Sequence, residues 1–203
     1  HRRAAGINYH CSTMDDLEKG VMIETIIDGV DFGPLAVLPG IWKGEKGMDI
    51  APEKDGSKEE NPFSEEIVFE IVGDVTNAGK QTLGVVRYHQ KVYHNKDGQQ
   101  FHDQVGYWVW DPAACTVMFT LTIPRAVSLV AGGDFDMGSI NDDAVSITVE
   151  SEEGGDWGVA QSPFMRDNAK TTGFKINLQV DGDKMSYSQT TFLDIYGRKF
   201  DHT

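Results

Sequence analysis

Short runs of β-branched and aromatic residues, separated by turn residues, occupy most of this chain after Trp42 and constrain its fold more than any other feature. In residues 174–180, apolar and polar side chains alternate strictly, so we expect one face of this strand to be buried and the other to be wet. Residues that favour hairpin turns lie at 95–98 and at 181–183. The predicted strands are Ile67–Val72, Leu83–Tyr93, Phe101–Trp110, Cys115–Thr122, Ala126–Ala131, Ala144–Glu150, Gly173–Val180 and Met185–Ile195.

This pattern predicts an all-β fold, a closed antiparallel up-and-down β-barrel of about ten strands with a short N-terminal helical segment. The alternative that the pattern leaves open is an open β-sandwich. Two polar segments, Ala51–Asn61 and Asp156–Lys170, are expected to be loops, the second with a helical turn at Pro163–Asn168.

The N-terminal region differs because Leu17, Val21 and Ile27 recur at near-helical spacing after a start signal at Ser12–Thr13. A second helical turn over Pro34–Leu38 is expected to plug one end of the barrel. We therefore expect an N-terminal helical extension, residues 1–32, and a β-barrel domain, residues 33–203.

Composition excludes several classes of partner. A chain of 203 residues with a net charge of −14 lacks the clustered Lys and Arg that nucleic acids or anionic membranes require. No apolar run approaches the ~20 residues of a membrane span, and no signal-peptide segment is evident, so a cytoplasmic location is expected. Two cysteines, Cys11 and Cys115, are too few for a disulfide framework, and Cys115 is expected to be a buried free thiol.

Histidines are the side chains that need closest attention, because hydrolase, zinc and phosphate-loop motifs are not found. His89 and His94 share a polar strand and are expected to face solvent. His102 lies on the strand face of Gln104, and a hydrogen-bonded wall residue is as good an interpretation there as a ligand site. His202 follows an alternating strand, and the residues alone favour a surface position.

Five motifs in order along the chain carry a resemblance to a known family. The first is Gly33–Gly44, which contains most of a Gly-x-Trp-x-Gly-x-Gly signature, although Lys46 stands at its last glycine and Gly47 comes one residue later. The others are Pro62–Phe69, Phe101–Trp108, Asp181–Ser188 and Phe200–His202. Together they span about residues 33–203 and resemble the nitrobindin family of small haem-binding β-barrels.

The resemblance implies a cofactor and the residues that hold it. The cofactor is haem b, and the histidine of the C-terminal motif, here His202, is the axial ligand of its iron. In the family a closing strand follows this histidine. The other residues that the resemblance places at the haem are His102, Phe101, Ile123, Phe63 and, near a propionate, Lys170.

The resemblance also implies an activity. Nitrobindins are credited with binding nitric oxide and isomerising peroxynitrite to nitrate, and an apolar Ile123 on the distal side does not favour peroxidase chemistry. The alternative is a lipocalin-like carrier of a fatty acid or another small apolar ligand, without haem. Under either interpretation the partner is a small molecule, and the protein is expected to be a monomer or homodimer.

Overall fold

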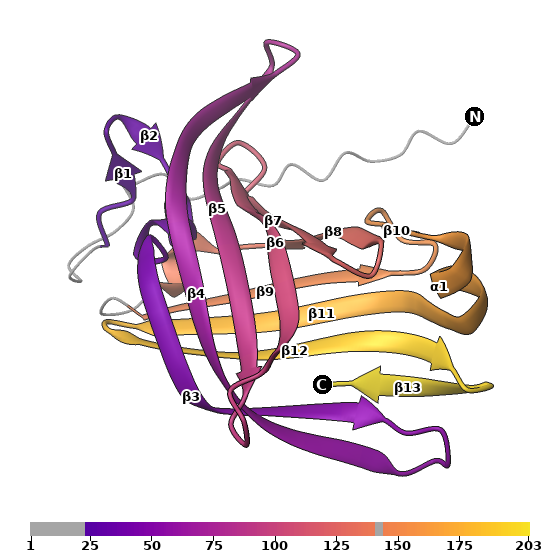
Figure 1. Cartoon of the computed structure of the whole chain (residues 1–203). Helices are drawn as coiled ribbons and strands as arrows, with labels where there is room; N and C mark the ends of the chain where they lie inside the picture. Colours follow the sequence, from indigo (N-terminus) through magenta and orange to yellow (C-terminus); the bar gives the residue numbers. More distant parts are fainter. Residues whose placement is uncertain (1–22, 141–143) are drawn as a thin grey trace, which may run out of the picture.

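The computed structural model describes residues 23–140 and 144–203 (Figure 1). Antiparallel strands make up nearly all of this part of the chain, with three short helical turns. The elements are β1 (Ile26–Ile27), β2 (Val30–Asp31), η2 (Gly33–Val37), β3 (Gly40–Pro52), β4 (Lys58–Asn77), β5 (Gln81–His94), β6 (Gln100–Asp111), β7 (Thr116–Ile123), β8 (Val127–Asp134), η3 (Met137–Ser139), β9 (Ala144–Glu152), β10 (Val159–Gln161), α1 (Pro163–Asn168), β11 (Ala169–Asp181), β12 (Lys184–Ile195) and β13 (Arg198–His202).

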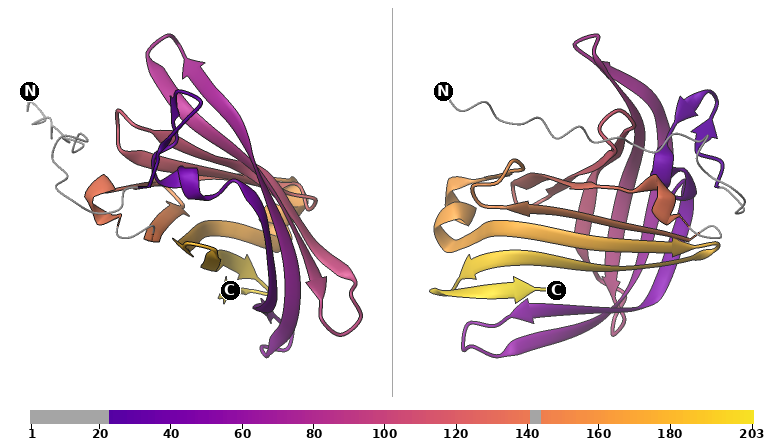
Figure 2. Two further views of the ribbon diagram at one scale, coloured as in Figure 1. Left: turned by 90° about the vertical axis from the view of Figure 1, so that its left-hand side faces the viewer. Right: turned by 180° about the vertical axis from the view of Figure 1, so that it is seen from behind.

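One long sheet runs in the order β13-β12-β11-β9-β8-β7-β6-β5-β4-β3, with β10 added to β8. The contact between β8 and β9 rests on a single register pair, Gly132 with Glu150. The sheet therefore consists of two well-paired halves, which cross each other in the views of Figures 1 and 2. No ladder closes it. Within the described residues, the edge strands β3 and β13 are joined by two backbone hydrogen bonds between Ile50 and Thr203, at 2.7 and 3.3 Å.

The all-β, antiparallel prediction is thus confirmed, whereas the expected closure by a continuous ladder is not observed. Thirteen strands are present in the described part of the chain, against about ten expected. The surplus comes from the short strands β1, β2 and β10, which are too short to show an alternating pattern of apolar and polar residues in the sequence.

A stack of aromatic rings joins the two halves of the sheet through the interior. Phe119 of β7 lies parallel to Phe174 of β11, with ring centroids 5.4 Å apart, and to Tyr88 of β5 at the same distance. Trp108 packs against Phe119 at 4.6 Å. Because these side chains are almost fully buried, the centre of the barrel is solid core.

The predicted helical turn at Pro34–Leu38 is confirmed as η2, which covers one end of the barrel. Leu35 and Leu38 are fully buried there. Trp42, the third residue of β3, is half-buried and donates its indole N–H to the carbonyl of Leu38 at 2.9 Å. The opposite end, where β3 ends and β13 begins, is called the far end below.

Three expectations about single segments were wrong. Ile26–Ile27, the end of the predicted N-terminal helix, pairs with Val30–Asp31 in a hairpin, and the earlier part of that helix lies outside the described residues. Most of segment 51–61 is strand, because β3 and β4 continue as a paired hairpin up to the turn at 53–57. Cys115 lies in the turn after β6 and takes part in a disulfide bond, so it is not a free thiol; the other cysteine is outside the described residues.

The irregular glycine signature corresponds to a β-bulge in β3. Gly44 pairs with Glu65 and Gly47 pairs with Phe63, so β3 uses one more residue than β4 over this stretch. A Cβ atom on Gly47 would lie 2.0 Å from the Phe63 ring, whereas one on Gly44 would make an ordinary contact at 3.5 Å. Gly47 therefore takes the role of the signature's last glycine, because it leaves space for an aromatic ring.

We predict that Gly47→Ala destabilises the protein, since the Phe63 ring must move to admit the methyl group. The expected loss in the free energy of unfolding is about 1–3 kcal/mol, as for other overpacked sites. Gly44→Ala is the matched control and should cost less. Urea denaturation measures both, and equal effects of the two substitutions would contradict the close contact with Phe63.

Candidate functional site

His202 faces the interior of the barrel from β13. It pairs with Thr191 of β12, which in turn pairs with the fully buried Phe174, so all three lie on the inner face of the sheet. Across the junction of the sheet edges, its Nε2 lies 2.7 Å from the carboxylate of Asp49 on β3. His202 and Asp49 are both partly buried, with 35% and 20% of their side chains exposed. The other ring nitrogen, Nδ1, has no partner among the described residues.

His102 faces the interior from the start of β6, at the far end. Its Nε2 lies 3.3 Å from Oε1 of Gln104, which is 2% exposed. Burial lowers the pKa of His102 below its ordinary value, and the charges of Arg125 and His202 lower it further, while Gln104 and Asp49 act in the opposite direction. His202 is therefore close enough to His102 for its charge to affect the pKa of His102.

An aromatic cluster at the same end contains two of the predicted pocket residues. Phe101 stacks on His94 with ring centroids 4.0 Å apart and meets Phe63 edge-on at 6.4 Å. His94 is half-buried, so the expectation that it faces solvent was wrong. The cause is a register irregularity between β5 and β6, where Val92 pairs with His102 but Tyr93 pairs with Gln100, leaving Phe101 free to cover His94. Three imidazoles therefore lie at the far end.

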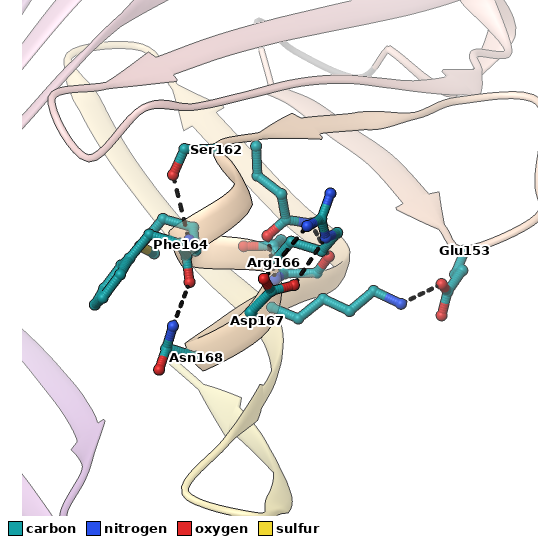
Figure 3. A network of polar contacts seen from close by, with 10 residues as sticks. Glu153, Ser162, Phe164, Arg166, Asp167 and Asn168 are labelled. Atoms are coloured by element: carbon teal, nitrogen blue, oxygen red, sulfur yellow. Dashed lines mark hydrogen bonds and ion pairs between the residues drawn. The ribbon is translucent and has the colours of Figure 1, made fainter.

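Ile123 and Lys170 are placed differently. Ile123 is the last residue of β7. Since the preceding residue, Thr122, pairs with Val105, Ile123 lies beside Gln104 on the neighbouring strand. Its side chain packs against the core. Lys170 pairs in register with the exposed Asp194 on the outer face of the sheet, and it forms an ion pair with Glu153 next to α1 (Figure 3). The structure thus groups Ile123 with the histidines and does not bring Lys170 to them.

A polar network crosses the barrel one layer below the histidines, and the sequence did not reveal it. The carboxylate of Glu65 on β4 accepts hydrogen bonds from Gln90 Nε2 at 2.7 Å and from the Tyr187 hydroxyl at 2.8 Å. Burial raises the pKa of Glu65, although both hydrogen bonds oppose this shift. The cavity beside this network has a volume of about 20 Å³, room for about one water molecule.

We predict a pH-dependent gain in stability for Glu65→Gln. Because folding raises the pKa of Glu65, the wild type loses stability as the pH rises from the unfolded-state pKa, about 4.3, through the raised folded-state pKa. Glutamine keeps an acceptor for Gln90 and Tyr187 but does not ionise. In urea denaturation, the stability of Glu65→Gln relative to wild type should therefore increase as the pH rises above the unfolded-state pKa.

The control for this experiment is Glu66→Gln. Glu66 is the next residue on β4, faces outward and pairs with Lys43 at 3.0 Å, so it tests the loss of a surface carboxylate. A difference between Glu65→Gln and wild type that stays constant with pH would contradict a buried ionisable group at position 65.

Comparison with known proteins places this arrangement in a family. The model of the family described as "THAP4-like, heme-binding beta-barrel domain" matches residues 31–203. The chain belongs to this family. The crystal structure of Rv2717c from M. tuberculosis aligns with a TM-score of 0.58 at 22% identity, over 83% of this chain and 89% of that chain, and shows the same fold. Among curated proteins, none matches.

The residues at the far end fit a haem by their chemistry. Imidazole is a common axial ligand of haem iron, and His102 and His202 each keep one ring nitrogen without a partner among the described residues. Phe63, Phe101 and Ile123 supply apolar surface beside them. Within residues 23–140 and 144–203, no group of three or more His, Cys, Asp or Glu side chains is arranged to hold a metal ion. No helix in these residues is long and apolar enough to span a membrane.

Proposed function

We propose that this barrel binds one haem b at its far end, with His202 as the axial ligand of the iron. The observation that supports this most directly is the convergence of His202 and His102 on the interior of one barrel end, in a member of a haem-binding family. His102, Phe101, Phe63 and Ile123 would contact the cofactor or its ligand. Lys170 would reach a propionate only after leaving Glu153.

Asp49 has a defined place in this proposal. Metal-binding histidines usually direct their second ring nitrogen to a carboxylate or carbonyl group, which fixes the ring and makes the ligand more basic. The contact between Asp49 and His202 supplies such a carboxylate, and only one of the two ring nitrogens is engaged in it. The other remains for the iron.

The proposed activity is the isomerisation of peroxynitrite to nitrate, with nitric oxide as a further ligand. The ferric haem would act as a Lewis acid, and the isomerisation conserves atoms and charge, so no further reactant is required. The protein's own contribution is orientation and the exclusion of water by the apolar side chains of Phe63, Phe101 and Ile123. A cytoplasmic location and a monomeric or dimeric state remain expectations from the sequence.

The carrier alternative has little support in the interior of the barrel. Sites for small apolar ligands have volumes of about 300–1,000 Å³. Here the stack of Tyr88, Phe119 and Phe174 occupies the centre and leaves an interior cavity of about 20 Å³. The larger hollow, of about 410 Å³, is lined by charged side chains such as those of Glu150, Lys175 and Lys199, which do not suit an apolar ligand. A fatty acid would have to displace this core.

We predict that added hemin produces a Soret band that saturates at one equivalent and that His202→Leu abolishes it. His94→Leu and His102→Ala are the matched controls, because they remove the other two imidazoles at the far end and should retain haem. Circular dichroism checks that each variant is folded. If His202→Leu binds haem unchanged while His94→Leu does not, the axial ligand is His94.

The activity is tested separately on the hemin-loaded protein. Stopped-flow mixing with peroxynitrite should show faster decay than hemin-free protein, with nitrate as the product. His102→Ala should retain haem and change this rate. A rate equal to that of the hemin-free protein would leave haem binding intact and contradict the isomerase.

A further inference from the structure

Two buried polar side chains, those of Tyr88 and Gln104, link the core to His102, and their hydrogen bonds have only one consistent direction. The Tyr88 hydroxyl lies 3.2 Å from the backbone carbonyl of Thr120 and donates to it, because a carbonyl can only accept. The Tyr88 oxygen then accepts from Nε2 of Gln104 at 2.9 Å. Tyr88 and Gln104 are 3% and 2% exposed, so bulk solvent does not reach these bonds.

This direction fixes the proton on His102. Since the amide nitrogen of Gln104 faces Tyr88, its carbonyl oxygen Oε1 faces Nε2 of His102, at 3.3 Å. A carbonyl oxygen carries no proton, so Nε2 of His102 must be the donor. Burial lowers the pKa of His102 and favours the neutral ring, which has a single N–H. Nδ1 is then an unprotonated acceptor, and it has no partner among the described residues.

We propose that Gln104, oriented by Tyr88, is a positioning residue that holds His102 as the Nε2-protonated tautomer, so that His102 offers a ligand at the far end an acceptor and not a donor. The consequence for ligand choice rests on the proposed haem function. The site should favour ligands that bring a proton, such as peroxynitrous acid, the protonated form of peroxynitrite, over anions that can only accept hydrogen bonds. Gln104 would thereby determine specificity without touching the ligand.

The tautomer is measured directly in the hemin-free protein. Long-range ¹H–¹⁵N NMR of histidine side chains distinguishes a protonated from an unprotonated ring nitrogen. In the wild type, His102 should show a protonated Nε2 and an unprotonated Nδ1. Tyr88→Phe keeps the ring that stacks on Phe119 but frees the amide of Gln104 to turn, and Gln104→Met removes the acceptor at similar size. In both variants the Nδ1 shift should move toward the protonated value.

His89 provides an internal control in the same spectra. Its Nε2 lies 3.2 Å from both carboxylate oxygens of Asp103, on the other face of the same strand pair, with no link to Gln104. Its ¹⁵N shifts should be the same in all three proteins. A wild-type His102 protonated on Nδ1, or shifts of His102 that neither variant changes, would overturn the proposal. With two independent variants, the loss of folding in one still leaves the other to decide.

The functional consequence is measured by fluoride binding to the hemin-loaded protein, because fluoride accepts hydrogen bonds and donates none. Once Nδ1 can carry a proton, fluoride affinity should rise about tenfold in Tyr88→Phe and in Gln104→Met, the contribution typical of a hydrogen bond to a charged acceptor. Unchanged affinity would overturn the role in ligand choice. If hemin does not bind at all, the haem function fails, while the NMR result still decides on the tautomer.

Discussion

The contact between Phe119 and Phe174 is the interaction on which the rest of the structure depends. These two rings lie 5.4 Å apart at an interplanar angle of 7°, and they belong to the two halves of the sheet. Backbone pairing holds the halves together only weakly in the described residues, through one register pair between β8 and β9 and two hydrogen bonds between β3 and β13. Side-chain packing must therefore supply most of the cohesion between them, and aromatic pairs contribute more than their buried area alone.

The same packing decides where chemistry can take place. Because Tyr88, Phe119 and Trp108 occupy the centre, the buried amide of Gln104 lies between this core and the histidines at the far end. Tyr88 belongs to both regions, since its ring packs in the core and its hydroxyl orders the amide of Gln104. A rigid core thus sets the direction of hydrogen bonds that end at a half-buried histidine, and the histidine needs no charged neighbour to be oriented.

Sequence reasoning succeeded where a short-range pattern carries the information. Strict alternation identified β11, and proline followed by helix-compatible residues identified η2 and α1. It failed for the hairpin at 51–61, because both faces of that segment are polar and no alternation exists to read. It also failed for His94, whose burial depends on an irregularity of register that no motif records.

The partners of the site residues were beyond the reach of a single sequence for a different reason. Motif resemblance pointed to His202 and His102, but Asp49 is 153 positions from His202, and Tyr187 is 122 positions from Glu65. These pairs form only because the barrel brings opposite strands together. Spacing along a chain carries no signal for such contacts, whereas the folded sheet makes them unavoidable.

The bulge in β3 also has a consequence for the site. Strand side chains alternate between faces, so one inserted residue reverses which positions point inward for the remainder of the strand. Before the bulge the inward positions of β3 are even-numbered, as at Trp42 and Gly44; after it they are odd-numbered, as at Gly47 and Asp49. The displaced glycine of the signature thus marks the point at which the inward-facing positions of β3 change from even-numbered to odd-numbered residues. It turns Asp49, and not its neighbour Met48, toward the imidazole of His202.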